Sequence, residues 1–204
     1  KIDEYYVQFL KRTLVPKLIE HFNSKPISIL DIGPNHDPVI LILKCLDVSL
    51  SDCTILEVGK GYYTVSSLLK YSKEITIIDN SKYPQPTKCY NLLIYMGPDF
   101  EISRSQFSIT TAKNRSGYKK QKKLFNQVIN ALDPKGLFFV SFHTPLEYYL
   151  YLALVKSNPE TSLSSSSPPK SKISKTTQSE NCAHMFITKA PVKNSSGNCS
   201  CLIL

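Results

Sequence analysis

Apolar residues gather in short runs that alternate with segments of helical spacing. The runs are rich in Ile, Leu and Val and therefore predict strands of a sheet covered on both faces: Ile27–Ile32, Cys53–Val58, Ile75–Ile78, Tyr90–Met96 and Leu137–Phe142. Strands that alternate with helices indicate right-handed crossovers and an open sheet. The pattern predicts an α/β fold with a doubly wound, mostly parallel sheet and helices on both of its faces.

A leading helix is predicted before the first strand. An apolar residue at every fourth position gives it a stripe on one side: Tyr6, Leu10, Leu14, Leu18 and Phe22. Because Pro16 removes a backbone donor in the middle of this helix, we expect a kink or a split there. Asp37 as N-cap and Pro38 at the first helical position predict a second helix to about Leu46, although Val39–Leu43 could equally form a strand. A short amphipathic helix is expected over residues 64–69.

Two further helices flank the fifth predicted strand. Asp133–Gly136 predicts a turn just before this strand. After the strand, Thr144 and Glu147 form a capping-box pattern, with Pro145 at the first helical position. The helix before the turn places its apolar residues on one side: Leu124, Phe125, Val128, Ile129 and Leu132.

The composition changes after residue 156. Residues 157–181 are rich in Ser, Pro, Lys and Thr, which cannot build a core, and we expect this segment to be disordered. His184–Lys189 predicts one last strand. We therefore expect a folded domain over residues 1–156, a disordered segment over 157–181, and a last strand and a tail over 182–204.

Length, charge and cysteine content narrow the class of protein. The chain has 204 residues and a net charge of +9, and no apolar run reaches the roughly 18 residues that a transmembrane helix needs. The six cysteines show no paired C-x-x-C spacing. We therefore expect reduced thiols in a cytoplasmic protein, and neither a disulfide framework nor a metal site. The final four residues fit a prenylation box, which predicts a lipid anchor at Cys201, and peripheral membrane binding, if the chain ends there naturally.

Two segments share one form and predict a ligand site. Ile29–Gly33 and Ile55–Gly59 each hold an apolar pair, an acid, an apolar residue and a glycine. In an open parallel sheet, ligands bind outside the carboxyl ends of the strands where the winding reverses, and glycine lets the chain turn close to the ligand. The ends of four strands should therefore surround one crevice: Gly33–His36, Glu57–Gly61, Asp79 and Met96–Asp99.

These motifs together resemble a class I S-adenosylmethionine-dependent methyltransferase, over roughly residues 3–156. The resemblance is carried by Asp31-x-Gly33 after an apolar strand, an acid ending the next strand, Tyr90–Tyr95 at the fourth, and a helix-Asp-Pro-x-Gly-strand that ends in Ser141–His143. It implies a Rossmann-like fold, S-adenosylmethionine as the cofactor and methyl transfer to a small-molecule acceptor. It also implies that the first glycine loop lies against the methionine part of the cofactor. The acid of the second strand would bind the ribose hydroxyls, since a carboxylate accepts two hydrogen bonds well.

The family pattern fits the sequence in two ways. In the first, Ile29–Gly33 is the first strand and Glu57 is the ribose acid. In the second, Leu56–Gly61 is the glycine loop and Asp79 is the ribose acid, which matches the usual spacing better but leaves residues 24–50 unexplained. We prefer the first. The expected cofactor-binding residues are Asp31, Gly33, Pro34, Asn35, Glu57, Gly59, Asp79, Tyr95 and Met96.

Departures from the family pattern leave alternatives open. The loop Gly33–His36 has a single glycine, so a catalytically weak or inactive binding module of the same fold is an alternative. No Asp/Asn-Pro-Pro-aromatic motif follows the fourth strand; Met96–Phe100 matches it only in part. His143, at a strand end near the crevice, is the candidate general base. A nucleic-acid methyltransferase is a less favoured alternative, based on a basic run that could contact phosphates: Lys113, Arg115, Lys119, Lys120, Lys122 and Lys123.

Overall fold

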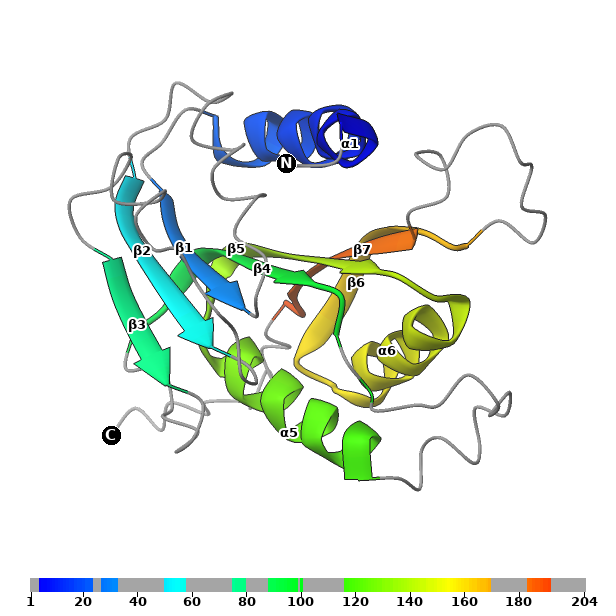
Figure 1. Ribbon diagram of the computed structural model, residues 1–204. Coiled ribbons are helices and arrows are strands. Elements are labelled where there is room, and N and C mark those ends of the chain that lie inside the picture. Colours follow the sequence, from blue (N-terminus) through cyan, green and yellow to red (C-terminus); the bar gives the residue numbers. More distant parts are fainter. Residues whose placement is uncertain are drawn as a thin grey trace, which may run out of the picture.

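In the computed structural model, a seven-stranded sheet lies between helices on its two faces (Figure 1). The structure describes residues 4–23, 27–32, 50–57, 75–79, 88–98, 100, 116–169 and 183–191. The helices in these ranges are α1 Glu4–Phe22, α5 Ser116–Asn130 and α6 Pro145–Ser157. The strands are β1 Ile27–Ile32, β2 Leu50–Glu57, β3 Ile75–Asp79, β4 Tyr90–Met96, β5 Leu132–Phe142, β6 Thr161–Ser167 and β7 Ala183–Lys189.

The strand order is β3-β2-β1-β4-β5-β7-β6. All pairings from β3 to β5 are parallel, whereas β7 is antiparallel to both β5 and β6. The winding reverses between β1 and β4, because the chain first builds outward from β1 to β3 and then returns to the other side of β1. The expected doubly wound, mostly parallel sheet is confirmed.

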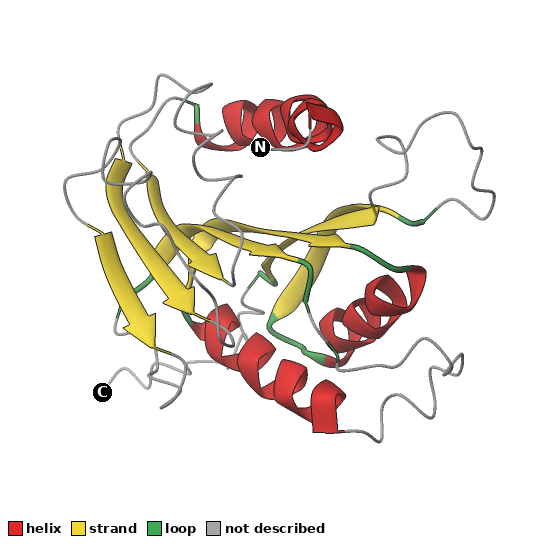
Figure 2. Ribbon diagram, viewed as in Figure 1, coloured by secondary structure: helices red, strands yellow, loops and turns green. Residues whose placement is uncertain are grey.

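Helices cover both faces of the sheet (Figure 2), and each face has its own core. The predicted stripe of α1 is buried at Leu10, Leu14 and Leu18 and packs on the β-strand residues of one face. The helix is not split at Pro16. Pro16 lies on the exposed side, and the buried leucines before and after it hold both halves against the sheet. The helix ends at Phe22, and the next residue, Asn23, caps it in a left-handed conformation, with φ of 47° and an N–H bond to the Ile19 carbonyl (3.1 Å).

Helices α5 and α6 cover the opposite face. The predicted stripe of α5 is buried against the sheet except for Leu132, which belongs to β5 and not to the helix. Phe125 of α5 meets Tyr151 of α6 with their ring centroids 5.4 Å apart. The capping box that begins α6 is present: Thr144 accepts a hydrogen bond from the Glu147 N–H, and the Glu147 carboxylate accepts one from the Thr144 N–H. Sequence and structure agree for both helices because each has a local signal, apolar spacing for α5 and cap chemistry for α6.

The Ser-rich stretch contains a strand, which corrects the prediction of disorder for the described part of it, residues 157–169. Thr161–Ser167 forms β6 at the edge of the sheet, antiparallel to β7. Backbone pairing supplies the contacts that its side chains lack, since only Leu163 packs against the core. Residues 170–182 lie outside the described residues. The last strand, expected over His184–Lys189, is confirmed as β7.

Strand β5 starts earlier than predicted. It begins at Leu132, opposite Tyr90, but the next pair is Leu137 opposite Leu92. The residues between them interrupt the regular pairing, and the Asp133 carboxylate accepts a hydrogen bond from the Lys135 N–H (2.8 Å), as expected for a turn. The helices predicted over residues 38–46 and 64–69 lie outside the described residues.

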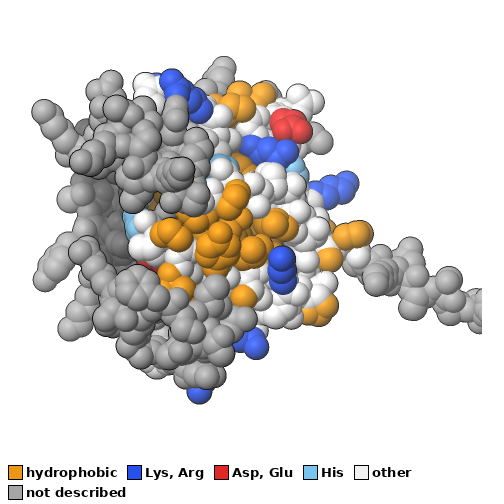
Figure 3. Space-filling view, turned by 90° about the vertical axis from the view of Figure 1, so that its right-hand side faces the viewer, with side chains coloured by type: hydrophobic (Ala, Val, Ile, Leu, Met, Phe, Trp, Pro, Cys, Tyr) orange, Lys and Arg blue, Asp and Glu red, His pale blue; other side chains and the backbone are white. Residues whose placement is uncertain are grey.

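The outer surfaces of α5 and α6 differ in character. Lys119, Lys120, Lys122 and Lys123 of α5 are exposed, whereas hydrophobic side chains gather on the side of the molecule that carries α6 (Figure 3). None of the helices that the structure describes combines the length and the apolar character needed to cross a membrane.

Candidate functional site

The ends of β1 and β4 lie side by side where the winding reverses. Asp31 is opposite Ile94, and Ile32 is opposite Tyr95. On its other side β1 pairs with β2, so that Ile32 is also opposite Leu56. The strand next to β4 is therefore Ile27–Ile32, as in the first way of fitting the family pattern; the second would put residues 53–58 in this place. Such a reversal point is where open α/β sheets bind ligands.

Two acids end the neighbouring strands. Glu57 is the last residue of β2 and Asp79 is the last residue of β3, and the two are paired in the register of the sheet. Glu57 is thus one strand away from β1, and Asp79 is two strands away. Among the other predicted residues, Gly33, Pro34, Asn35 and Gly59 lie outside the described residues, as do the side chains of Glu57 and Asp79.

Asp31 lies inside the sheet, one residue before the end of β1. Its side chain is fully buried, and the strand that carries it lies between β2 and β4. A buried carboxylate costs free energy unless a polar partner or a bound group compensates for it. Packing alone does not explain an acid in the central strand, so Asp31 is retained as a candidate for the site.

The turn after β4 is held against the end of β5. The Gly97 N–H donates to the Ser141 carbonyl (3.0 Å), and the Ser141 hydroxyl donates to Met96 Sδ (3.3 Å). Gly97 has φ of +67°, and a Cβ atom added there would collide with the imidazole of His143. The position therefore needs glycine for two reasons, its backbone conformation and the close approach of the ring.

This contact brings His143 together with the turn after β4, at the carboxyl ends of β4 and β5. It follows β5 directly, its side chain is exposed, and its ring lies on the Gly97 turn that follows β4. The backbone N–H of His143 donates to the Glu147 carboxylate (2.9 Å), which also caps α6. Glu147 therefore fixes the backbone at His143, and Gly97 provides the surface on which the ring lies.

Tyr95 and Met96 project to opposite faces of the sheet. Tyr95 is 2% exposed, and its hydroxyl and the Gln121 amide of α5 exchange hydrogen bonds of 3.0 and 3.2 Å. Met96 is 4% exposed and lies in the core under α1. Both side chains are therefore buried at the end of β4. The sequence analysis did not identify Gln121, although a glutamine among the apolar positions of α5 was a visible signal.

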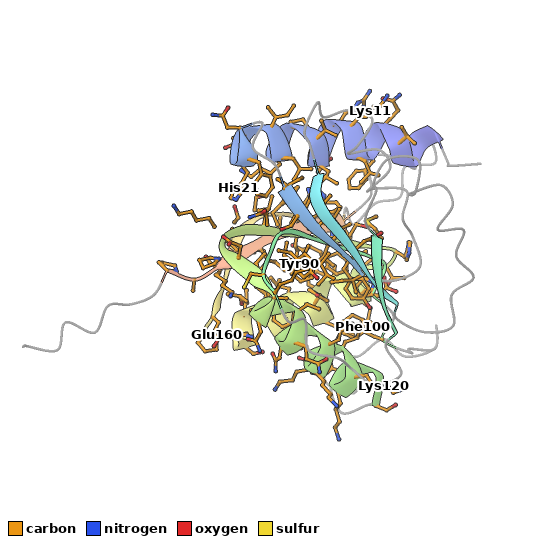
Figure 4. All side chains as sticks on the ribbon, turned by 90° about the vertical axis from the view of Figure 1, so that its left-hand side faces the viewer. Lys11, His21, Tyr90, Phe100, Lys120 and Glu160 are labelled. Carbon is orange, nitrogen blue, oxygen red and sulfur yellow. The ribbon has the colours of Figure 1, made fainter. Side chains whose placement is uncertain are left out.

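Phe100 is part of the core. Its ring stacks on Tyr118 of α5 at a centroid distance of 6.2 Å, and its side chain is 1% exposed. Figure 4 shows Phe100 close to α5, whereas Lys120 points outward from the same helix. The aromatic residue of the partial match Met96–Phe100 is therefore unavailable to a methyl acceptor, which agrees with the absence of the amino-methyltransferase motif from the sequence.

Comparison with solved structures identifies the fold. The N-methyltransferase NodS from Bradyrhizobium japonicum WM9, in complex with S-adenosyl-L-homocysteine, superimposes with a TM-score of 0.57 and 9% identity over 90% of this chain and 88% of that chain. The plantazolicin methyltransferase BpumL, in complex with the same compound, superimposes with a TM-score of 0.57 and 13% identity over 92% of this chain and 85% of that chain. The ribosomal protein L11 methylase from Lactobacillus delbrueckii subsp. bulgaricus superimposes with a TM-score of 0.55 and 10% identity over 92% of this chain and 78% of that chain.

No protein-family model matches the sequence, and no curated protein is similar enough to match. The similarity therefore rests on three-dimensional structure, where it extends over both halves of the sheet. It confirms the fold that the sequence motifs led us to expect. The chain has the Rossmann-like fold of class I S-adenosylmethionine-dependent methyltransferases.

Proposed function

We propose that this protein transfers a methyl group from S-adenosylmethionine to a small-molecule acceptor. The observation that carries the proposal is the reversal of winding between β1 and β4, with an acid at the end of β2 next to it. Two of the structural neighbours are complexes with S-adenosyl-L-homocysteine, the demethylated form of this cofactor. The residues present fit such a cofactor, because a parallel-sheet crevice with an adjacent carboxylate suits a nucleoside ribose.

Each predicted residue has a role in this proposal. The loop with Gly33, Pro34 and Asn35 follows β1 and approaches the methionine part of the cofactor, while Glu57 accepts hydrogen bonds from the ribose hydroxyls. The other cofactor-binding residues that we propose shape or line the crevice: Asp31, Gly59, Asp79, Tyr95 and Met96. The bound cofactor supplies a methyl group already activated on its sulfonium, so that positioning of the acceptor does most of the work of this chain.

His143 is the residue that we assign to proton transfer. Its exposed ring lies on the Gly97 turn, where the ends of β4 and β5 border the crevice, and it can take a proton from the acceptor nucleophile. His143→Ala should keep cofactor affinity within about twofold but lower methyl transfer by roughly a hundredfold. Transfer of radiolabelled methyl groups to a panel of small amines, phenols and carboxylic acids measures this effect. Equal transfer by both proteins would remove His143 from the mechanism.

Calorimetric titration with S-adenosylmethionine tests the cofactor proposal. Glu57→Ala should weaken binding on the order of a hundredfold, because two charge-assisted hydrogen bonds of about 1.5 kcal/mol each are lost. Asp79→Ala should have little effect, and the exposed Glu160→Ala is a matched control. The second fit of the family pattern would be favoured if Asp79→Ala lost most of its affinity for S-adenosylmethionine while a folded Gly33→Val kept the wild-type affinity. If the wild-type chain shows no heat of binding up to about millimolar S-adenosylmethionine, the protein is instead a non-catalytic module whose single-glycine loop does not hold the cofactor.

A further inference from the structure

Helix α6 is apolar on its outward side as well as on its buried side. It has two charged residues, Glu147 and Lys156, and its buried side is formed by Tyr148, Leu150, Tyr151, Leu154 and Val155. A helix that is apolar all round is normally enclosed by protein or lipid. Here Tyr149 is 43% exposed, and three more apolar residues beside it are half-buried, of which the two leucines also pack against the edge of the core. We call this surface the α6 face: Leu146, Tyr149, Leu152 and Ala153.

Glu147 does not place a negative charge on the α6 face. Its carboxylate accepts hydrogen bonds from the backbone N–H groups of His143 and Thr144 (2.9 and 3.0 Å), so it is turned back toward the start of the helix. This leaves the α6 face apolar along its length, with the cation of Lys156 exposed in the last turn.

Two lysines and one acidic residue lie near the end of the α6 face: Lys122, Lys156 and Glu160. A hollow of about 340 Å³ separates the end of α6 from α5, and Lys122 and Asn126 of α5 line it with Asn158 and Glu160. The Asn158 amide donates to the Asn126 side chain (3.3 Å) and fixes this arrangement. Helix α5 contains no acidic residue, and the whole chain has a net charge of +9. A complementary partner is therefore apolar at its centre and negatively charged around it.

These charges distinguish between occupants. In a two-fold contact with a second copy, the same patch meets itself, so that the lysines at its rim would approach each other. A nucleic acid would match the lysines but would leave the apolar centre without contacts. An anionic lipid surface satisfies both requirements, because leucine and tyrosine side chains enter the interface while lysines reach the headgroups.

We propose that the α6 face docks on an anionic membrane surface. Leu146, Tyr149 and Leu152 enter the headgroup region, and Lys122 and Lys156 contact the acidic lipid headgroups. The binding is peripheral and reversible, because one helix face buries little apolar area compared with a spanning segment. This proposal does not depend on methyl transfer.

Vesicle co-sedimentation of the full chain tests the proposal. Binding to phosphatidylcholine vesicles with about 30% phosphatidylserine should be at least about tenfold tighter than to phosphatidylcholine alone, and should weaken as salt is added. Tyr149→Ser with Leu152→Ser should reduce binding to the mixed vesicles by about tenfold or more. Lys156→Gln should reduce it by about fivefold. Circular dichroism and thermal melting show that each variant is folded.

Ile19→Ser is the matched control, because Ile19 is an apolar residue that is 55% exposed on α1, across the sheet. It should leave vesicle binding unchanged. The proposal is overturned if the wild-type chain ignores acidic vesicles, or if the folded double variant binds them as well as the wild type does. It is also overturned if sedimentation velocity shows a dimer that the double variant abolishes, since a second copy then covers the α6 face.

Discussion

Helices α5 and α6 cover the same face of the sheet, yet they expose opposite chemistry. Both bury an apolar stripe in one core, where Phe125 of α5 meets Tyr151 of α6. Outside, α5 presents lysines to the solvent, whereas α6 presents Tyr149, with the half-buried Leu146 and Leu152 on either side of it. The buried sides of the two helices are equivalent for folding. The difference lies on the outside, where packing constrains the side chains less than in the core.

This comparison separates residues that specify the fold from residues that point to function. Packing constrains the inward positions of both helices, because a deleted buried side chain leaves a cavity. Outward positions tolerate almost any polar residue, so apolar residues there need another explanation. Substitutions on the two sides of one helix should therefore have very different effects on stability.

The largest expected effect compares two tyrosines of α6. Tyr151 is 1% exposed and lies against a group of rings, with those of Phe125 and Phe142 at centroid distances of 5.4 and 5.5 Å. Tyr151→Ala should lower the free energy of unfolding by about 3–5 kcal/mol. Tyr149→Ala, two residues earlier, should change it by no more than about 0.5 kcal/mol. Urea denaturation of both variants measures the difference, and similar losses would show that the outward side also supports the fold.

A strand could be predicted from the sequence only where its residues form an apolar run. Strands β1 and β4 were found because both of their faces are covered, which requires a continuous run of Ile, Leu and Tyr. Strand β6 was missed because Thr161–Ser167 contains one apolar residue, and an edge strand can be held by backbone pairing to a single neighbour. Disorder and such an edge strand have the same composition, and only the position of β7 distinguishes them.

A second prediction concerns the ionisation of Tyr151. Burial, with a smaller contribution from Tyr95, raises the pKa of Tyr151 well above its usual value of about 10. In the unfolded chain the phenol ionises near pH 10, whereas in the folded protein it stays protonated. The contribution of Tyr151 to the free energy of unfolding therefore has its full value below about pH 10. Above that pH it falls by about 1.4 kcal/mol per pH unit, until the pKa of the folded state is reached.

Comparison with Tyr151→Phe isolates this effect. The phenylalanine keeps the ring but cannot ionise, and contributions from the other tyrosines cancel in the difference between the two proteins. Urea unfolding at about pH 9 and pH 11 should show a smaller loss of stability for Tyr151→Phe than for the wild type. Parallel losses would mean that the phenol of Tyr151 reaches water in the folded state.

The candidate site was predictable only where its chemistry is local in sequence. The sequence predicted an acid at the end of two apolar strands, and Glu57 and Asp79 indeed end adjacent strands. The contact between Gly97 and His143 was not predictable, because it depends on the register that brings the ends of β4 and β5 together. The same is true of the buried pair Tyr95 and Gln121, which join a strand to a helix.

The smallest expected effect tests whether the lysines of α5 serve the fold. Lys119 lies in the first turn of α5, where the helix dipole disfavours a positive charge, and the residue four positions later is Lys123. Lys119→Glu would place an acid near the start of the helix and one turn before a lysine, the orientation that favours an ion pair. We therefore expect the variant to be more stable than the wild type by about 0.5 kcal/mol at low salt, with the gain reduced by added salt. Lys119→Gln removes the positive charge but adds no ion pair, so its free energy of unfolding should lie between those of the wild type and of Lys119→Glu. If instead urea denaturation shows that Lys119→Glu destabilises the protein, Lys119 contributes to the stability of the fold. The exposed side of α5 would then also be constrained by folding.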